Sequence, residues 1–112
     1  MSEKTNILYL CVLIAISDYE LQNEETHKII KISKELKIDF NVHKAFEEIQ
    51  NKFREDFDAA CNFYLNNITT PKYRQLAKKY LKDVALVDND LKDREVRFLD
   101  LCKQAWGREA FD

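Results

Sequence analysis

Apolar residues fall into segments that alternate with short polar ones along this chain. Between residues 7 and 16 nearly every side chain is apolar, and a helix that is apolar all round belongs at the centre of a bundle. Thr5 or Asn6 is the predicted N-cap of this helix, since both side chains accept hydrogen bonds from free backbone amides. The pattern therefore predicts a central helix around which the other segments pack.

Five further segments carry an apolar stripe at the spacing of one helix face. They cover residues 24–36, 41–53, 57–67, 71–87 and 94–106. Residues that favour helix starts precede them: Asn23, Asp39 or Asn41, Asp56, Thr69-Thr70-Pro71 and Asp93. In the last helix the inner face is assigned to Val96, Leu99, Cys102 and Trp106, widened by Phe98 and Leu101, and Gly107 ends it. The expected fold is all-α: a compact bundle of about six helices in one domain, residues 1–112.

Composition supports a helical, globular chain. Hydrophobic residues make up 46% and charged residues 34% of the 112 positions, which is typical of a folded globule. Gly and Pro occur once each, too few for the tight turns of a β-sandwich or for the glycine-rich loops that cradle phosphates. The formal charge of -2 offers no basic surface for nucleic acid, so no nucleic-acid partner is expected.

Cellular location is inferred from the cysteines and from the first apolar run. Cys11, Cys61 and Cys102 lie far apart among apolar neighbours and form no Cys-x-x-Cys pair, so buried thiols in a reducing compartment are expected. The run at 7–16 has the length of a signal-peptide core, but Glu3 accompanies Lys4 before it, and it is too short to span a bilayer. We therefore expect a cytoplasmic protein without direct membrane insertion.

An acidic turn occurs twice in the chain. Residues 18–25 read Asp-Tyr-Glu-Leu-Gln-Asn-Glu-Glu, and residues 88–95 read Asp-Asn-Asp-Leu-Lys-Asp-Arg-Glu, at a constant offset of 70 positions. Each turn follows an apolar helix and precedes an amphipathic one. The chain thus contains two helix–acidic turn–helix units, which predicts a pseudo-twofold relation between its halves.

The two units share the pattern Ala-x-x-Asp-x-acidic-Leu-x-x-x-Glu. Its residues are Ala15, Asp18, Glu20, Leu21 and Glu25 in the first copy, and Ala85, Asp88, Asp90, Leu91 and Glu95 in the second. The arrangement resembles the TerB-like tellurite-resistance family and covers most of the chain. The resemblance implies an all-helical fold, an acidic surface that binds divalent metal in some members, and a link to stress response or to membrane-associated protein assemblies. Where the family commonly has Gly, this chain has Tyr19 and Asn89; Asn tolerates a left-handed backbone better than Tyr, which favours the second turn as a site.

Three interpretations of the acidic residues remain open. A hard cation such as Ca²⁺ prefers several oxygen ligands, and Asp18, Glu20, Glu25, Asp88, Asp90 and Glu95 are the candidate metal ligands. Glu25 and Glu95 also lie where a helix dipole favours negative charge, by about 0.3–1 kcal/mol each, so helix capping explains them equally. The third interpretation is an acidic surface that docks a protein partner.

No catalytic residues are assigned from the sequence. His27 and His43 are the only imidazoles, and neither belongs to a His-Glu-x-x-His pattern. The expected function is a non-enzymatic binding or stress-response module with a divalent metal, Ca²⁺ first, as its one candidate cofactor. The alternative is a metal-dependent, hydrolase-like enzyme built from the same carboxylates.

Overall fold

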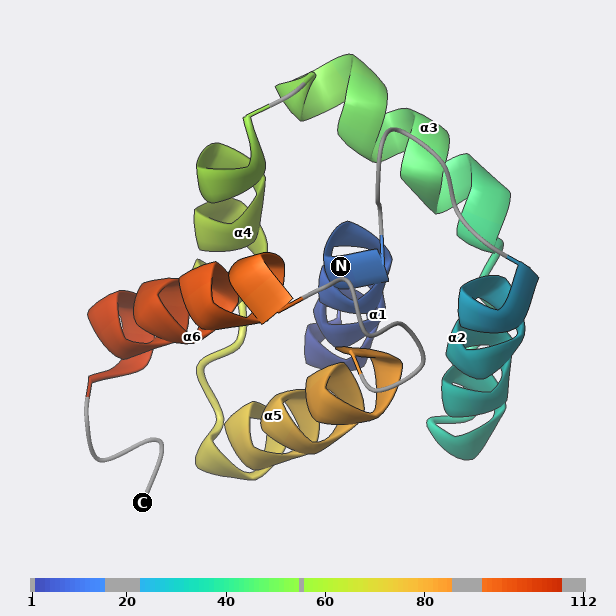
Figure 1. Ribbon diagram of the computed structural model, residues 1–112. Helices are drawn as coiled ribbons and strands as arrows, with labels where there is room; N and C mark the ends of the chain where they lie inside the picture. Colours follow the sequence, from blue (N-terminus) through green and yellow to red (C-terminus); the bar gives the residue numbers. More distant parts are fainter. Residues whose placement is uncertain (1, 16–22, 55, 86–91, 108–112) are drawn as a thin grey trace.

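The computed structural model describes residues 2–15, 23–54, 56–85 and 92–107, with the side chains of 85 and 92–95 excepted. These residues form six α-helices and, within the same ranges, no strand. The helices are α1 (Glu3–Ala15), α2 (Asn23–Glu35), α3 (Val42–Phe53), α4 (Phe57–Asn66), α5 (Pro71–Ala85) and α6 (Lys92–Trp106). The prediction of an all-α bundle of about six helices is confirmed (Figure 1).

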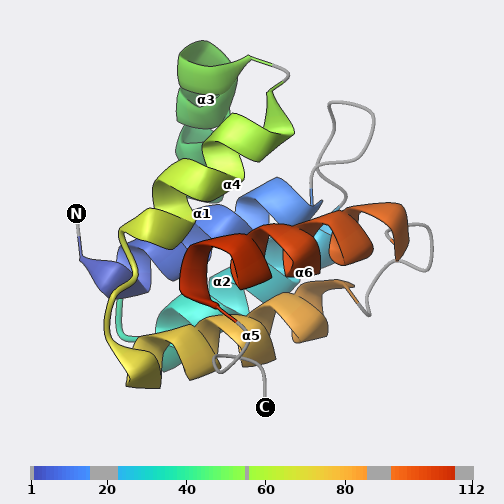
Figure 2. The same cartoon turned by 90° about the vertical axis from the view of Figure 1, so that its left-hand side faces the viewer.

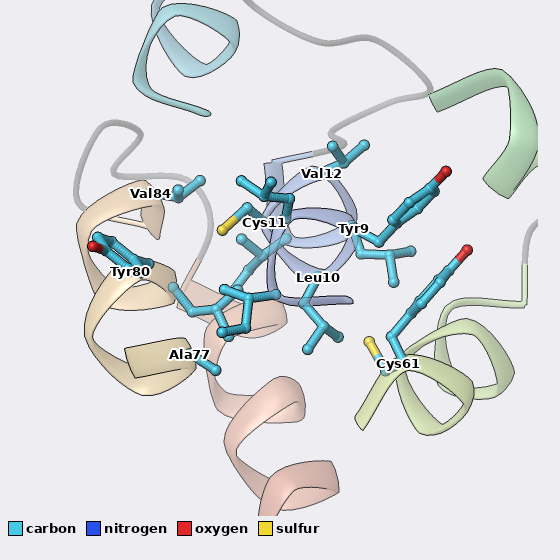
Figure 3. Close-up of a cluster of buried hydrophobic side chains, with 14 of the residues drawn as sticks. Tyr9, Leu10, Cys11, Val12, Cys61, Ala77, Tyr80 and Val84 are labelled. Atoms are coloured by element: carbon cyan, nitrogen blue, oxygen red, sulfur yellow. The ribbon is translucent and has the colours of Figure 1, made fainter. Parts of the chain in front are cut away.

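The central helix predicted from the apolar run is α1. Every residue from Asn6 to Ala15 is buried, and the other five helices lie around it in Figure 1. Figure 3 shows residues of α5, including Ala77 and Tyr80, on one side of α1 and Cys61 of α4 on another. The helix therefore has no solvent-facing side over these ten positions, which is why its sequence lacks a polar stripe.

Hydrogen bonds between helix ends fix the helix directions. The Glu3 carboxylate, at the start of α1, accepts the backbone N–H groups of Thr69 and Thr70 at 2.6 and 2.7 Å, so α1 and α5 begin side by side. Lys4 Nζ donates to the Leu36 carbonyl at 3.5 Å, just beyond α2, so α2 returns antiparallel to α1. The ends of α1 and α5 and the starts of α2 and α6 consequently lie at one end of the bundle (Figure 2).

The two helical units agree in helix direction but differ in packing. α2 contacts α1, α3 and α5, whereas the main partner of α6 is α4. Trp106 Nε1 donates to the Leu65 carbonyl at 2.9 Å, and Arg97 forms an ion pair with Asp58, so α4 and α6 run in parallel. Within the described part of the first unit, α2 makes no contact as extensive as the one between α6 and α4.

Local caps begin two helices as expected, while the cap of α1 was assigned wrongly. Asn41 and Asp56 accept the amides of Lys44 and Ala59, both at 3.0 Å, at the starts of α3 and α4. In α1, Ser2 Oγ accepts the Thr5 amide at 3.2 Å, so Ser2 is the cap and the helix begins earlier than predicted.

The buried face of α6 agrees with the prediction except at Val96. Phe98, Leu101, Cys102 and Trp106 are buried, whereas Val96 is 60% exposed. The main partner of α6 is α4, which sets the width of this face. The other expectations about apolar segments hold: Cys11, Cys61 and Cys102 are buried thiols, and among the described residues no helix is long and apolar enough to cross a membrane.

Candidate binding site

The starts of α2 and α6, which carry the predicted ligands Glu25 and Glu95, lie at the end of the bundle where α1 and α5 end; we call it the acidic end. Four of the six predicted metal ligands, Asp18, Glu20, Asp88 and Asp90, fall outside the described residues. Glu95 lies early in α6, where only the backbone is described. Glu25 is therefore the one predicted ligand whose side chain the structure places, and the assembly of a metal site from these six residues stays a prediction.

Glu25 occupies the first turn of α2 and is only 1% exposed. Transfer of a carboxylate out of water is costly, so a buried carboxylate is held by hydrogen bonds or by positive charge. The helix dipole of α2 supplies part of that compensation. Among the described residues no group of three or more His, Cys, Asp or Glu side chains is arranged to hold a metal ion.

A second cluster of polar side chains, which the sequence did not reveal, lies between α1, α3 and α4. Tyr9 of α1 donates its hydroxyl hydrogen bond to Glu48 Oε2 of α3. The Tyr9 ring stacks on Tyr64 of α4, with ring centroids 4.9 Å apart and planes 16° apart, and meets the edge of Phe40 at 5.5 Å. The carboxylate of Glu48 is therefore held at a fixed position against two buried phenols.

The two phenols remain protonated in this environment. Burial, followed by the hydrogen bond to Glu48, raises the pKa of Tyr9 well above its usual range. Burial and the negative charge of Glu48 raise the pKa of Tyr64 to about 12. Since a neutral phenol is a hydrogen-bond donor and Glu48 is an acceptor, Tyr9 orients the carboxylate without neutralising its charge.

Two hollows flank the bond between Tyr9 and Glu48, and together we call them the Glu48 cleft. Each has a volume of about 250 Å³. The first is lined by residues that include Asp39, Phe40 and Lys44. The second is lined by Asn6, Glu48, Lys52, Phe63, Tyr64 and Asn67. Both hollows lie along the first half of α1, away from the acidic end.

Sequence reasoning missed this cleft because its parts are distant in the chain. Tyr9 and Glu48 are 39 positions apart, and Glu48 reads as one more solvated charge on α3. The only local signal was an aromatic residue, Tyr9, within an otherwise aliphatic run. A phenol in such a run requires a hydrogen-bond partner when it is buried.

Comparisons with protein-family models, with curated proteins and with solved structures give no match. The resemblance to the TerB-like family consequently rests on the repeated acidic pattern. Together, the fold and the two polar regions define a small helical domain with one acidic end and one aromatic cleft.

Proposed function

We propose that this chain is a non-enzymatic, TerB-like binding module whose acidic end binds a divalent cation, Ca²⁺ first, or docks a protein partner. The observation that carries the proposal is that α2 and α6, whose starts carry Glu25 and Glu95, begin at the same end of the bundle. Carboxylate oxygens gathered at one place are the ligands that a divalent cation such as Ca²⁺ prefers. Glu25 would then be an inner ligand, with the other acidic residues as outer ones.

The directions of the helices support the same proposal. α1 and α5 begin side by side, as the bonds from Thr69 and Thr70 to Glu3 show. Their ends, and the starts of α2 and α6 that carry Glu25 and Glu95, lie at the same end of the molecule (Figure 2). The fold therefore brings the starts of α2 and α6 to one end of the bundle, and we propose that the charges of segments 18–25 and 88–95 act together there.

The proposal is tested by titration with Ca²⁺, Mg²⁺, Mn²⁺ and Zn²⁺, followed by calorimetry and by thermal unfolding. A cation that binds only the native state raises its stability, by about 2.7 kcal/mol at a free concentration of 100 Kd. We expect Asp88→Asn and Glu25→Gln to reduce this gain strongly, and Asp18→Asn to reduce it less. Asp100→Asn, on the exposed face of α6, is the matched control.

Two outcomes would count against the cation. If no cation raises Tm above that of a control at equal ionic strength, the carboxylates act as helix caps or as a docking surface. If a cation raises Tm equally in Asp88→Asn, Glu25→Gln and wild type, it binds elsewhere. Docking of a basic protein segment at the acidic end would then be tested by calorimetry with lysine-rich peptides and the same variants.

A further inference from the structure

The Glu48 cleft is bordered by a buried acceptor that has no donor in the described part of the chain. Asn6 is 1% exposed, and its Nδ2 donates to the Ser2 carbonyl at 2.9 Å, which fixes the side-chain amide. Its Oδ1 is buried and has no hydrogen-bond partner among the same residues. Because this oxygen has almost no exposed surface, the acceptor that a ligand in the hollow can reach is Glu48.

Glu48 adds a charged acceptor to the wall of the same hollow. A carboxylate accepts several hydrogen bonds, and the Tyr9 hydroxyl supplies one of them. Within the described residues, no ion pair neutralises Glu48. Glu48 thus presents a charged acceptor to the hollow, which favours a ligand that is positively charged and carries N–H donors.

The aromatic side of the hollow already holds an ammonium group. Lys52 Nζ lies 3.6 Å from the centroid of the Phe63 ring and 5.4 Å from that of Phe53. Phe63 meets Tyr64 edge to face at 5.1 Å, so the rings form a continuous aromatic wall. A cation above an aromatic face is attracted by the ring quadrupole, and Lys52 shows that an alkylammonium fits this wall.

From these features we infer that the Glu48 cleft binds a primary alkylammonium group, with Glu48 as the hydrogen-bond acceptor and the Phe63 ring as a cation–π surface. Lys52 occupies part of this site when no ligand is bound. The ligand therefore competes with the protein's own lysine. This site is separate from the cation site proposed at the acidic end, because its residues line the opposite half of α1.

Two sources could supply the alkylammonium: a free diamine, or the side chain of a lysine in a peptide. 1,5-Diaminopentane represents the free diamine, and Nα-acetyl-lysine methylamide represents the lysine of a peptide. Calorimetric titrations with both compounds show which source binds more tightly. Tetramethylammonium, which has the charge but no N–H donor, is the control ligand. Acetate is the control anion, since Lys52 and the Asn67 amide could instead attract a negative charge.

The variants are chosen so that their effects have opposite signs. Glu48→Gln keeps the shape and removes the charge, so amine binding should weaken about tenfold or more, as expected for a charge-assisted hydrogen bond. Lys52→Met removes the competing ammonium, so binding should tighten severalfold. Glu47→Gln and Lys103→Met, both at exposed positions, are the matched controls and should leave the affinity unchanged.

One further measurement separates ligand loss from misfolding. The far-ultraviolet circular dichroism of Glu48→Gln and Lys52→Met, which alter exposed positions, should match that of wild type. The inference is overturned if neither amine binds wild type or Lys52→Met, if Glu48→Gln leaves amine affinity unchanged in a folded variant, or if acetate binds more tightly than the amines. Failure of metal binding at the acidic end leaves each of these results unaffected.

Discussion

Because α1 is enclosed on all sides, truncation of a side chain on any face of this helix should lower the free energy of unfolding. In an ordinary surface helix one face tolerates truncation, whereas in α1 Leu8 and Leu10 are both 0% exposed and Leu13 is 3% exposed. At 3.6 residues per turn, Leu8 and Leu10 point to nearly opposite sides of the helix. Leu→Ala at each of the three positions should therefore cost a similar amount of stability.

The magnitude follows from the number of carbons removed and from the room left to relax. Leu→Ala removes three carbons, which corresponds to about 2.4 kcal/mol of transfer free energy at about 0.8 kcal/mol each. Because helices pack against α1 from every direction, the surrounding side chains cannot collapse far into the space. The cavity term then raises the expected loss to about 3–5 kcal/mol.

Urea unfolding monitored by far-ultraviolet circular dichroism measures these losses. With a slope of about 2 kcal/mol per molar urea, a loss of 3 kcal/mol lowers the midpoint by about 1.5 M. Leu76→Ala, at a partly buried position on α5, is the matched control and should cost less. A loss below about 1 kcal/mol for Leu8→Ala or Leu10→Ala, with an unchanged slope, would show that one side of α1 is open and would refute the central placement.

Two further predictions concern titratable groups. Hydrogen bonds from Thr70 and Thr69 lower the pKa of Glu3 from 4.5 to about 2. The Glu3 carboxylate therefore stabilises the fold above pH 4.5 and loses that effect as the pH falls toward 2. The difference in Tm between wild type and Glu3→Gln should be constant above pH 5 and vanish near pH 2, and a difference that does not change with pH would contradict these hydrogen bonds. Burial raises the pKa of Cys11 and of Cys102 far above the usual thiol range. Both thiols should therefore resist alkylation by iodoacetamide at pH 8 until urea unfolds the chain. Fast labelling of the native protein would show that these thiols are accessible.

Local signals in the sequence were sufficient for most of the fold. Asn41 and Asp56 cap their helices through amides three residues onward, so the cap and its partner could be identified together. The start of α5 was also predicted, but its free amides bond to Glu3, 66 and 67 positions earlier in the chain. No local pattern contains a contact of that separation, and the exposed position of Val96 on α6 was missed for the same reason, since α4, the main partner of α6, sets the width of the inner face.

The candidate sites divide in a similar way. The acidic residues were found by repetition within the sequence, and the burial of Glu25 was not foreseen because acidic residues in a first turn usually remain in water. The Glu48 cleft combines residues from three helices, and its decisive feature is the hydrogen bond from Tyr9 to Glu48. This bond exists only after the fold has brought α1 and α3 together.

The bonds between Glu3 and the start of α5 also have a consequence for the order of biosynthesis. α1 is made first, yet its most extensive partner, α5, begins 68 residues later at Pro71. At a synthesis rate of about 5–20 residues per second, α1 waits roughly 3–14 s for that partner. During this interval the side of α1 that packs against α5 is without its native cover, so we expect this side to be a binding site for holdase chaperones on the nascent chain.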